Sequence, residues 1–419
     1  MNMEISKAKR IRSIVAASSG NLVEWYDFYI YAFSAIYFAH TFSTSQNDTI
    51  QQINAFGIFA LGFLMRPIGS WLFGSLADKI GRKSSMIFSV ILMALGSFMI
   101  AALPSKESVG DFAILFLLLA RLIQGLSVGG EYGIAATYLS ELASEGKRGF
   151  YSSFQYVTLI GGQLLAVASI SVLLLFFDEA EMKEWAWRIL FVFGGLLALG
   201  SLFVRGVMHE TGQNLKKHED RGTLKALFNT SWREFLIVVG ITAGGSLAFY
   251  TITTYSKTFM INSAGIDATT SNHIMLIALF ILMIFQPIFG ALGDKIGHQR
   301  SLLIFAILAL IGVYPLFSLI KSGGEFIAFA AIIALFIILS FYTSVAGIFK
   351  AKLFPEHVRA LGTGFGYAIP NAIFGGSAPY VALQFKENGI ENGFFVYLAV
   401  MMILVFIVAK MLPKNAKLI

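Results

Sequence analysis

Three acids and two arginines interrupt segments that are otherwise almost entirely apolar. Glu24 and Asp27 lie in the first long apolar segment, Arg66 in the second, and Arg121 and Glu131 in the fourth. A charge at the centre of a lipid bilayer costs about 2.5 to 3.5 kcal/mol on insertion scales. These charges therefore predict either buried structural pairs that neutralise one another or a pathway for charged solutes.

Asp27 and Glu24 are the candidates for carrying a proton, with Arg121 and Glu131 in the same predicted coupling group. Loss of water and the approach of an arginine act in opposite directions on the proton affinity of a carboxylate. Movement of Arg121 relative to the acid would therefore load or release a proton. Glu24 lies about one helical turn from Asp27, and the residues alone leave the choice between them open.

Arg66 is the first candidate for binding a carboxylate, because a planar guanidinium can pair with both carboxylate oxygens. It lies about 18 Å along a helix from Asp78, which is expected at the membrane surface, so Arg66 is expected near the midplane. Arg121 is expected to share this task. Lys257 is expected near the outer end of its segment, where it either attracts anions or extends its ammonium to the membrane surface.

The elements that must position these residues are helices that span a bilayer. The 419 residues are 57% hydrophobic and 13% charged, with a mean hydropathy of +0.74, whereas soluble domains are about a quarter charged. One crossing requires about 20 apolar residues. The sequence predicts an all-α membrane protein with twelve transmembrane helices, at residues 14–39, 52–74, 84–103, 112–140, 150–177, 187–208, 234–258, 271–293, 301–320, 325–350, 359–386 and 393–412.

Composition also excludes several classes of protein. The chain has no cysteine and its six histidines show no ligand spacing, so no disulfide, metal site or cofactor is expected. No nucleophile with an adjacent base is apparent, which argues against an enzyme. The formal net charge is +7, but the basic residues fall in alternate loops, so the expected partner is the lipid bilayer and not nucleic acid. Because Glu24 and Asp27 lie within it, the first segment is expected to be retained and not cleaved as a signal peptide.

The loops differ in charge, and this difference predicts the orientation of the chain. If the N-terminus is cytoplasmic, the loops on that side carry most of the lysines and arginines, with Lys350 among them. The positive-inside rule then places both termini in the cytoplasm. The opposite loops carry only Lys106, Lys183, Arg188, Lys257, Lys321 and Lys386.

Two stretches recur between the halves of the chain. GSLADKIG from Gly74 recurs as GALGDKIG from Gly290. Internal repeats of this kind predict two pseudo-symmetric six-helix bundles, residues 1–208 and 234–419, joined by a cytoplasmic linker at residues 209–233. At one constant offset Arg148, Phe154 and Tyr156 recur as Arg359, Phe365 and Tyr367.

The repeated loop and the fourth span carry a family resemblance. GSLADKIGRK from Gly74 and RLIQGLSVGGEYG from Arg121 resemble signature sequences of the major facilitator superfamily. The resemblance implies that the two bundles rock around a central site to give alternating access. His298 replaces the arginine expected in the second loop, so the two gates are not expected to be symmetric. The residues implied in gating are Gly74, Asp78, Gly81, Arg82 and Asp294.

Further stretches resemble one branch of that superfamily, the metabolite:proton symporters. These are GNLVEWYDFY from Gly20 and RPIG from Arg66, while GFYSSFQYVTLIGGQ from Gly149 and NAIFGGSA from Asn371 resemble its 2-oxoglutarate carriers. The resemblance implies a proton symporter for 2-oxoglutarate or a similar dicarboxylate, acting as a monomer in the cell inner membrane. Citrate, shikimate, proline and betaine are the alternative substrates, and a channel or scaffold would not account for the repeated signature loops.

The same resemblance implies a set of neutral substrate ligands beside Arg66 and Arg121. They lie on spans that line the cavity in this superfamily, although each is equally suited to polar contacts between helices. These residues are Tyr132, Tyr156, Gln163, Tyr250, Tyr255 and Asn371.

Overall fold

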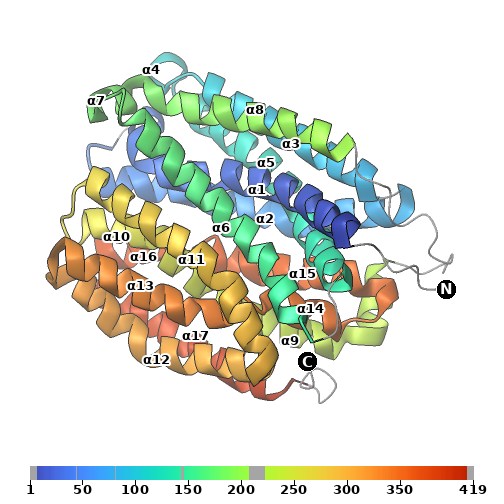
Figure 1. Ribbon diagram of the computed structural model, residues 1–419. Helices are drawn as coiled ribbons and strands as arrows, with labels where there is room; N and C mark the ends of the chain where they lie inside the picture. The colour runs from blue at the N-terminus through green and yellow to red at the C-terminus, as the bar shows by residue number, and fades with distance from the viewer. Residues whose placement is uncertain (1–6, 44, 81, 143–145, 207–221, 413–419) are drawn as a thin grey trace.

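The computed structural model describes residues 7–43, 45–80, 82–142, 146–206 and 222–412, and regular structure within these residues is helical throughout. Figure 1 shows the earlier helices in the upper part of the view and the later ones below them. The first set of helices comprises α1 (Lys7–Phe38), η1 (Ala39–Phe42), α2 (Asp48–Ile80), α3 (Arg82–Ala102), α4 (Lys106–Val109), α5 (Phe112–Leu142), α6 (Arg148–Leu173), α7 (Glu179–Glu181), η2 (Met182–Ala186) and α8 (Trp187–Gly206).

The second set of helices contains more interruptions than the first. Three of its long helical runs are broken, two of them by the π-helical turns η3 and η5. The set comprises α9 (Leu224–Tyr250), η3 (Thr251–Tyr255), α10 (Ser256–Asn262), α11 (Ala268–Ile296), α12 (His298–Ser322), α13 (Gly324–Thr343), α14 (Ala346–Leu353), η4 (Glu356–Val358), α15 (Arg359–Pro370), η5 (Asn371–Gly375), α16 (Ala378–Glu387) and α17 (Glu391–Lys410).

Each expected membrane span corresponds to a helix or an interrupted helical run in the described part of the chain. Nine of these runs are long and apolar enough to cross a bilayer. The others are α1, α3 with its shorter apolar part Ile87–Ala102, and the broken run from α15 to α16. Helices satisfy their own backbone hydrogen bonds, which is what a chain in hydrocarbon requires. The predicted all-α architecture is confirmed.

The helices pair in the same way within the two sets. In the first set α3 packs against α5 and α8, and in the second set α12 packs against α13 and α17. Likewise α1 packs against α6 and α8, while α9 packs against α15 and α17. The repeated sequence stretches therefore have a counterpart in a repeated packing arrangement.

The two sets meet along α2, α5 and α6 on one side and α11, α14, α15 and η5 on the other. Glycines bring α2 and α5 close together beside this interface. A Cβ at Gly125 would overlap the backbone oxygen of Gly62, and a Cβ at Gly129 would overlap that of Arg66. Small residues permit such close crossings in membrane helices. Gly129, which contacts the backbone of Arg66, lies about one helical turn before Tyr132 on α5.

The connection between the sets differs in part from its prediction. Helix α9 begins at Leu224, earlier than the span expected from residue 234, and Thr223 caps it by accepting a hydrogen bond from the Ala226 N–H at 3.2 Å. The helix breaks at Ser231, where φ is −144°. Residues 207–221 of the expected linker lie outside the described residues.

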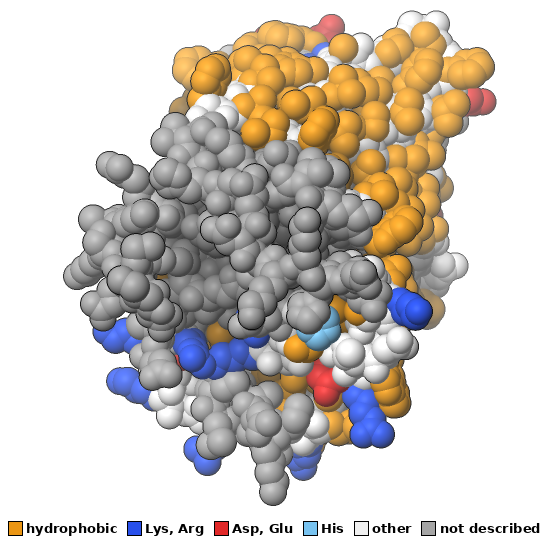
Figure 2. Space-filling view, turned by 90° about the vertical axis from the view of Figure 1, so that its right-hand side faces the viewer, with side chains coloured by type: hydrophobic (Ala, Val, Ile, Leu, Met, Phe, Trp, Pro, Cys, Tyr) orange, Lys and Arg blue, Asp and Glu red, His pale blue; other side chains and the backbone are white. Residues whose placement is uncertain are grey.

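The start of α1 and the end of α17 lie at the same end of the molecule (Figure 1). An even number of crossings produces this arrangement. Figure 2 views that end: apolar side chains cover the flank, and lysine and arginine side chains gather around the lower part. Large apolar side chains are also exposed elsewhere on the outside, Phe203 and Phe326 each at 82%. Such a surface suits contact with lipid and not with water.

Candidate functional site

Arg66 lies between the two sets of helices, enclosed by aromatic rings. Its side chain is 1% exposed, and its guanidinium lies 3.8 Å from the ring centre of Phe63 and 4.1 Å from that of Phe28. Nη1 donates to the hydroxyl of Tyr250 on α9 at 3.4 Å. Nε and Nη2 have no hydrogen-bond partner among the described residues. The guanidinium therefore retains donors that can bind a carboxylate.

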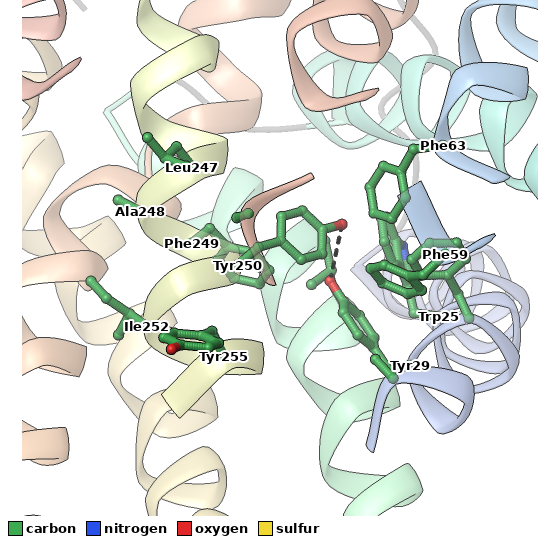
Figure 3. Close-up of a cluster of buried hydrophobic side chains, with 14 of the residues drawn as sticks. Trp25, Tyr29, Phe59, Phe63, Leu247, Ala248, Phe249, Tyr250, Ile252 and Tyr255 are labelled. Carbon is green, nitrogen blue, oxygen red and sulfur yellow. Dashed lines mark hydrogen bonds between the residues drawn. The ribbon is translucent and has the colours of Figure 1, made fainter. Parts of the chain in front are cut away.

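Tyrosines from both sets converge around this arginine. The hydroxyls of Tyr29 on α1 and Tyr250 on α9 are 3.4 Å apart, and Figure 3 shows them directed toward one another. Tyr132 on α5 stacks on Tyr367 on α15 with ring centres 3.5 Å apart. Tyr156 on α6 lies within electrostatic range of Tyr132, Tyr250 and Tyr367. These five residues form what we call the tyrosine cluster.

Two buried amides lie beside or near the cluster and retain unused polar atoms. Asn371 opens the π-helical turn η5, and neither its Oδ1 nor its Nδ2 has a partner among the described residues. A Cβ at Gly375 would lie 2.8 Å from both Asn371 Oδ1 and the Tyr250 ring. Gln163 Nε2 donates to Thr253 Oγ1 at 3.0 Å across the interface, while its Oε1 accepts from no described residue. Both amides can therefore bind a polar solute, and π-helical turns are frequent at functional sites.

Asp27 lies inside the first set of helices and faces α8. It is fully buried, and neither carboxylate oxygen is hydrogen-bonded to a described residue. A Cβ at Gly194 on α8 would overlap Asp27 Oδ1, so a glycine is required to accommodate the acid. The Ser97 side chain lies near enough to act as a donor to the carboxylate, although outside strict hydrogen-bond geometry, and Arg121 acts on it electrostatically. The proton occupancy of such a carboxylate depends on the position of the neighbouring arginine.

Arg121 and Glu24 are also buried in the first set but have other partners. Arg121 Nη1 donates to Gln124 Oε1 at 2.6 Å, and its guanidinium lies 4.3 Å from the ring centre of Tyr31. Glu24 Oε1 accepts a hydrogen bond from the Ser89 hydroxyl at 3.0 Å, among other interactions. The structure thus distinguishes the two acids, because the Ser89 hydroxyl bonds to Glu24 whereas no described residue meets hydrogen-bond geometry with the Asp27 oxygens.

Two lysines that were expected in loops are buried instead. Lys257 is 2% exposed and donates to the Phe33 carbonyl at 3.1 Å and to Asn272 Oδ1 at 3.0 Å. Lys350 is 0% exposed and donates to the Tyr132 hydroxyl at 3.1 Å. The predicted extension of Lys257 to the membrane surface is wrong, as is the assignment of Lys350 to a loop. The apolar run before Lys350 was the signal that could have identified its burial.

Other predicted site residues are not brought to the cluster. The ring of Tyr255 packs on Phe259 and Phe394, with centres 6.0 and 5.8 Å apart, and Figure 3 shows it below and apart from the Tyr29 and Tyr250 hydroxyls. No group of side chains suited to a metal ion occurs among the described residues. The side-chain positions of Glu131, Gly74, Asp78 and Arg82, and all of Gly81, lie outside the described residues, so their roles stay predictions.

Asp294 links the two sets near the end of α11. Its carboxylate accepts hydrogen bonds from the backbone N–H groups of Gly149 at 2.7 Å and Phe150 at 3.0 Å, at the start of α6. His298 Nε2 lies 3.2 Å from Asp294 Oδ1. The first N–H groups of a helix lack internal partners and carry partial positive charge. Asp294 therefore caps a helix of the other set, and His298 supports it in the place where an arginine was expected.

We expect Asp294→Asn to favour conformations that are open at this end of the molecule. The amide keeps the size but loses the charge, and a hydrogen bond to a charged group contributes about 1.5 to 3 kcal/mol. The open population should therefore rise about tenfold or more. Because the chain has no cysteine, spin labels on cysteines introduced at Lys147 and Arg300 can report the distance between the sets.

Asp267→Asn is the matched control for this change. Asp267 also caps a helix, accepting from the Thr270 N–H at 2.9 Å, but within α11 itself. Its loss should leave the label distances unaltered. A distance distribution for Asp294→Asn that matches that of the unsubstituted protein would contradict the role of Asp294 in holding this end of the molecule closed.

Comparison with known proteins gives consistent matches along the chain. The sequence matches the Major Facilitator Superfamily over residues 17–379. It is 52% identical to the alpha-ketoglutarate permease of Escherichia coli (strain K12), covering 98% of this chain and 95% of the relative. It is 30% identical to the citrate-proton symporter of Klebsiella pneumoniae, covering 92% and 87%. A partially occluded, inward-open structure of the xylose transporter XylE from E. coli has a TM-score of 0.76 at 17% identity, covering 97% of this chain and 98% of that one, which shows a shared fold.

Proposed function

The chain belongs to the Major Facilitator Superfamily, and we propose that it is a proton-coupled symporter that takes up 2-oxoglutarate or a closely similar dicarboxylate. It is a multi-pass membrane transporter and not an enzyme. The observation that carries the substrate is the 52% identity to alpha-ketoglutarate permease across 98% of the chain. The citrate-proton symporter, at 30% identity, represents the alternative substrates.

Arg66 is the principal substrate ligand in this proposal. Its support is its position between the two sets, its contact with Tyr250 of the opposite set and its unused donors. A dicarboxylate that leaves water needs fixed donors of this kind. The neutral ligands are those predicted residues that lie within or near the tyrosine cluster, namely Tyr132, Tyr156, Gln163, Tyr250 and Asn371.

Asp27 and Arg121 form the proton-coupling pair. Both lie inside the first set, and Arg121 is among the charges that act on Asp27. A shift of Arg121 during rocking would change the proton affinity of the acid. Arg121 therefore acts in proton coupling and Arg66 in substrate binding, although Arg121 was expected to take part in both.

Alternating access arises from rocking of residues 1–208 against residues 234–419, with residues 209–233 as the cytoplasmic linker. Two contacts near opposite ends of the helices support this arrangement. Asn262 Nδ2 donates to Gln52 Oε1 at 3.1 Å at one end, and Asp294 caps α6 at the other. Opening either end while the other stays closed would expose the central site to one side at a time.

The end that carries the termini faces the cytoplasm, and the protein resides in the cell inner membrane as a monomer surrounded by lipid. The lysines and arginines gathered at that end support this orientation (Figure 2), because positively charged segments are retained on the cytoplasmic side.

Counterflow of labelled 2-oxoglutarate in proteoliposomes tests the function. We expect unlabelled 2-oxoglutarate and succinate to compete, with proline and shikimate much weaker. In a separate assay with an imposed pH gradient, a protonophore should abolish accumulation. Citrate competing better than 2-oxoglutarate would favour the alternative. Accumulation that is insensitive to the protonophore would exclude proton symport.

A further inference from the structure

Lys350 is a fully buried cation with few compensating partners. It lies on α14, at 0% exposure, and donates a hydrogen bond to the neutral Tyr132 hydroxyl at 3.1 Å. Aromatic rings surround it, with the ammonium 4.6 Å from the ring centre of Tyr367 and 5.8 Å from that of Tyr342. An ammonium has three donors. Among the described residues, no carboxylate forms a salt bridge with it.

Such a site favours an anion. Removing an ammonium from water costs far more free energy than contacts with aromatic rings recover. A buried lysine is therefore stable in its charged form only with a counter-charge. Lys257 differs, because the Phe33 carbonyl and Asn272 Oδ1 both accept hydrogen bonds from it. Lys350 is therefore the buried lysine with the greater need for an anionic partner.

Buried cations outnumber buried carboxylates among the described side chains, which do not include that of Glu131. Among the described buried side chains, two carboxylates face four cations, apart from a histidine, so two positive charges are in excess. A dianion adds negative charge to such a site, whereas a zwitterion adds no net charge. The carboxylates are Glu24 and Asp27, and the cations are Arg66, Arg121, Lys257 and Lys350.

Lys350 and Arg66 lie on opposite sets but share a neighbour in the tyrosine cluster. Tyr367 carries the Lys350 ammonium over its ring and lies within electrostatic range of Arg66. Tyr132 stacks on Tyr367 and accepts the hydrogen bond from Lys350. It lies on the same helix as Gly129, and Gly129 packs on the backbone of Arg66. The two cations thus approach the same tyrosine, Tyr367, from opposite sets of helices.

We propose that Lys350 binds one carboxylate of the transported dianion while Arg66 binds the other. The inference rests on the proposed function and adds the second anchor, on the C-terminal side of the interface. The substrate then joins the two sets by its own charges, and binding of both carboxylates favours closure around it. A monocarboxylate satisfies one anchor and leaves the other without a counter-ion.

The test compares 2-oxoglutarate with 2-oxopentanoate, which has the same carbon chain but lacks the second carboxylate. Inhibition constants for both are measured by counterflow with the full chain in proteoliposomes. We expect Lys350→Met to weaken 2-oxoglutarate about tenfold to a hundredfold and 2-oxopentanoate less than about threefold, as loss of one charge-assisted contact requires. Lys350→Arg keeps the charge and should retain most of the preference for the dicarboxylate.

Lys257→Met is the matched control, since it removes another buried lysine but leaves both proposed anchors. Its ratio of the two inhibition constants should equal that of the unsubstituted protein. Should Lys350→Met fail to fold, Lys350→Gln removes the charge while keeping a donor for Tyr132, and thermal stabilisation by each acid gives the same ratio.

The outcomes separate this inference from the function on which it rests. An undiminished dicarboxylate preference in Lys350→Met or Lys350→Gln overturns the second anchor and leaves the transporter function standing. Equal losses of the preference in the Lys350 and Lys257 variants would also overturn it, because the effect would then be general. Failure of the unsubstituted protein to exchange 2-oxoglutarate would overturn both.

Discussion

Asp27→Asn should abolish accumulation of 2-oxoglutarate driven by an imposed pH gradient while leaving counterflow of labelled substrate intact. Counterflow exchanges loaded carriers and does not need the proton to leave, whereas net uptake requires the empty carrier to return without it. The amide has nearly the shape of the acid but cannot release a proton. Proteoliposomes with and without a pH gradient measure the two activities on one preparation.

The surroundings of Asp27 support this expectation. Its oxygens meet hydrogen-bond geometry with no described residue. Asp27 faces Gly194, where any larger residue would overlap the carboxylate. Hydrogen bonds to the charged form would hold a carboxylate ionised, and near Asp27 such a contribution comes from the Ser97 side chain. Arg121 also acts on the carboxylate, so its position influences the proton.

Glu24→Gln is the matched control for Asp27→Asn. Glu24 is buried in the same helix, but the Ser89 hydroxyl donates to it. Its amide should retain gradient-driven accumulation. The reverse pattern, with accumulation kept in Asp27→Asn and lost in Glu24→Gln, would transfer the coupling role to Glu24.

The membrane spans could be predicted because the length of an apolar run reflects the thickness of the bilayer. Counting residues along a helix also placed Arg66 and Asp27 in the interior, where the structure buries both. The same method failed for Lys257 and Lys350. Their backbones lie near helix ends, but their long side chains extend inward, and residue counts do not give the direction of a side chain.

The faces of the interrupted helices could not be predicted either. Tyr250 and Tyr255 lie close together in the sequence and were both predicted as substrate ligands, yet only Tyr250 joins the tyrosine cluster. The π-helical turn Thr251–Tyr255 changes the helical period after Tyr250, and no residue type in the sequence predicts such a turn. Tyr29 was missed because a tyrosine in an apolar span looks like any packing residue. Tyr367 had a signal in its repeat relationship to Tyr156.

Arg66→Lys should lower the affinity for 2-oxoglutarate about tenfold to a hundredfold. Lysine keeps the positive charge but lacks the planar fork, and a charge-assisted hydrogen bond contributes about 1.5 to 3 kcal/mol, where each 1.4 kcal/mol is tenfold in affinity. The guanidinium also stacks on the rings of Phe63 and Phe28, a contact that an ammonium reproduces only in part. Counterflow at a series of substrate concentrations measures the loss.

The sharper form of this test again uses 2-oxopentanoate. A site without the planar guanidinium should no longer favour the second carboxylate. The preference for 2-oxoglutarate over 2-oxopentanoate should therefore shrink in Arg66→Lys. Arg121→Lys is the matched variant, because Arg121 is equally buried but bonds to Gln124 within its own set. It should impair gradient-driven accumulation while keeping the ratio of the two inhibition constants. Unchanged affinity and unchanged discrimination in Arg66→Lys would contradict the assignment, and Arg66 would then be a structural cation that holds Tyr250 across the interface.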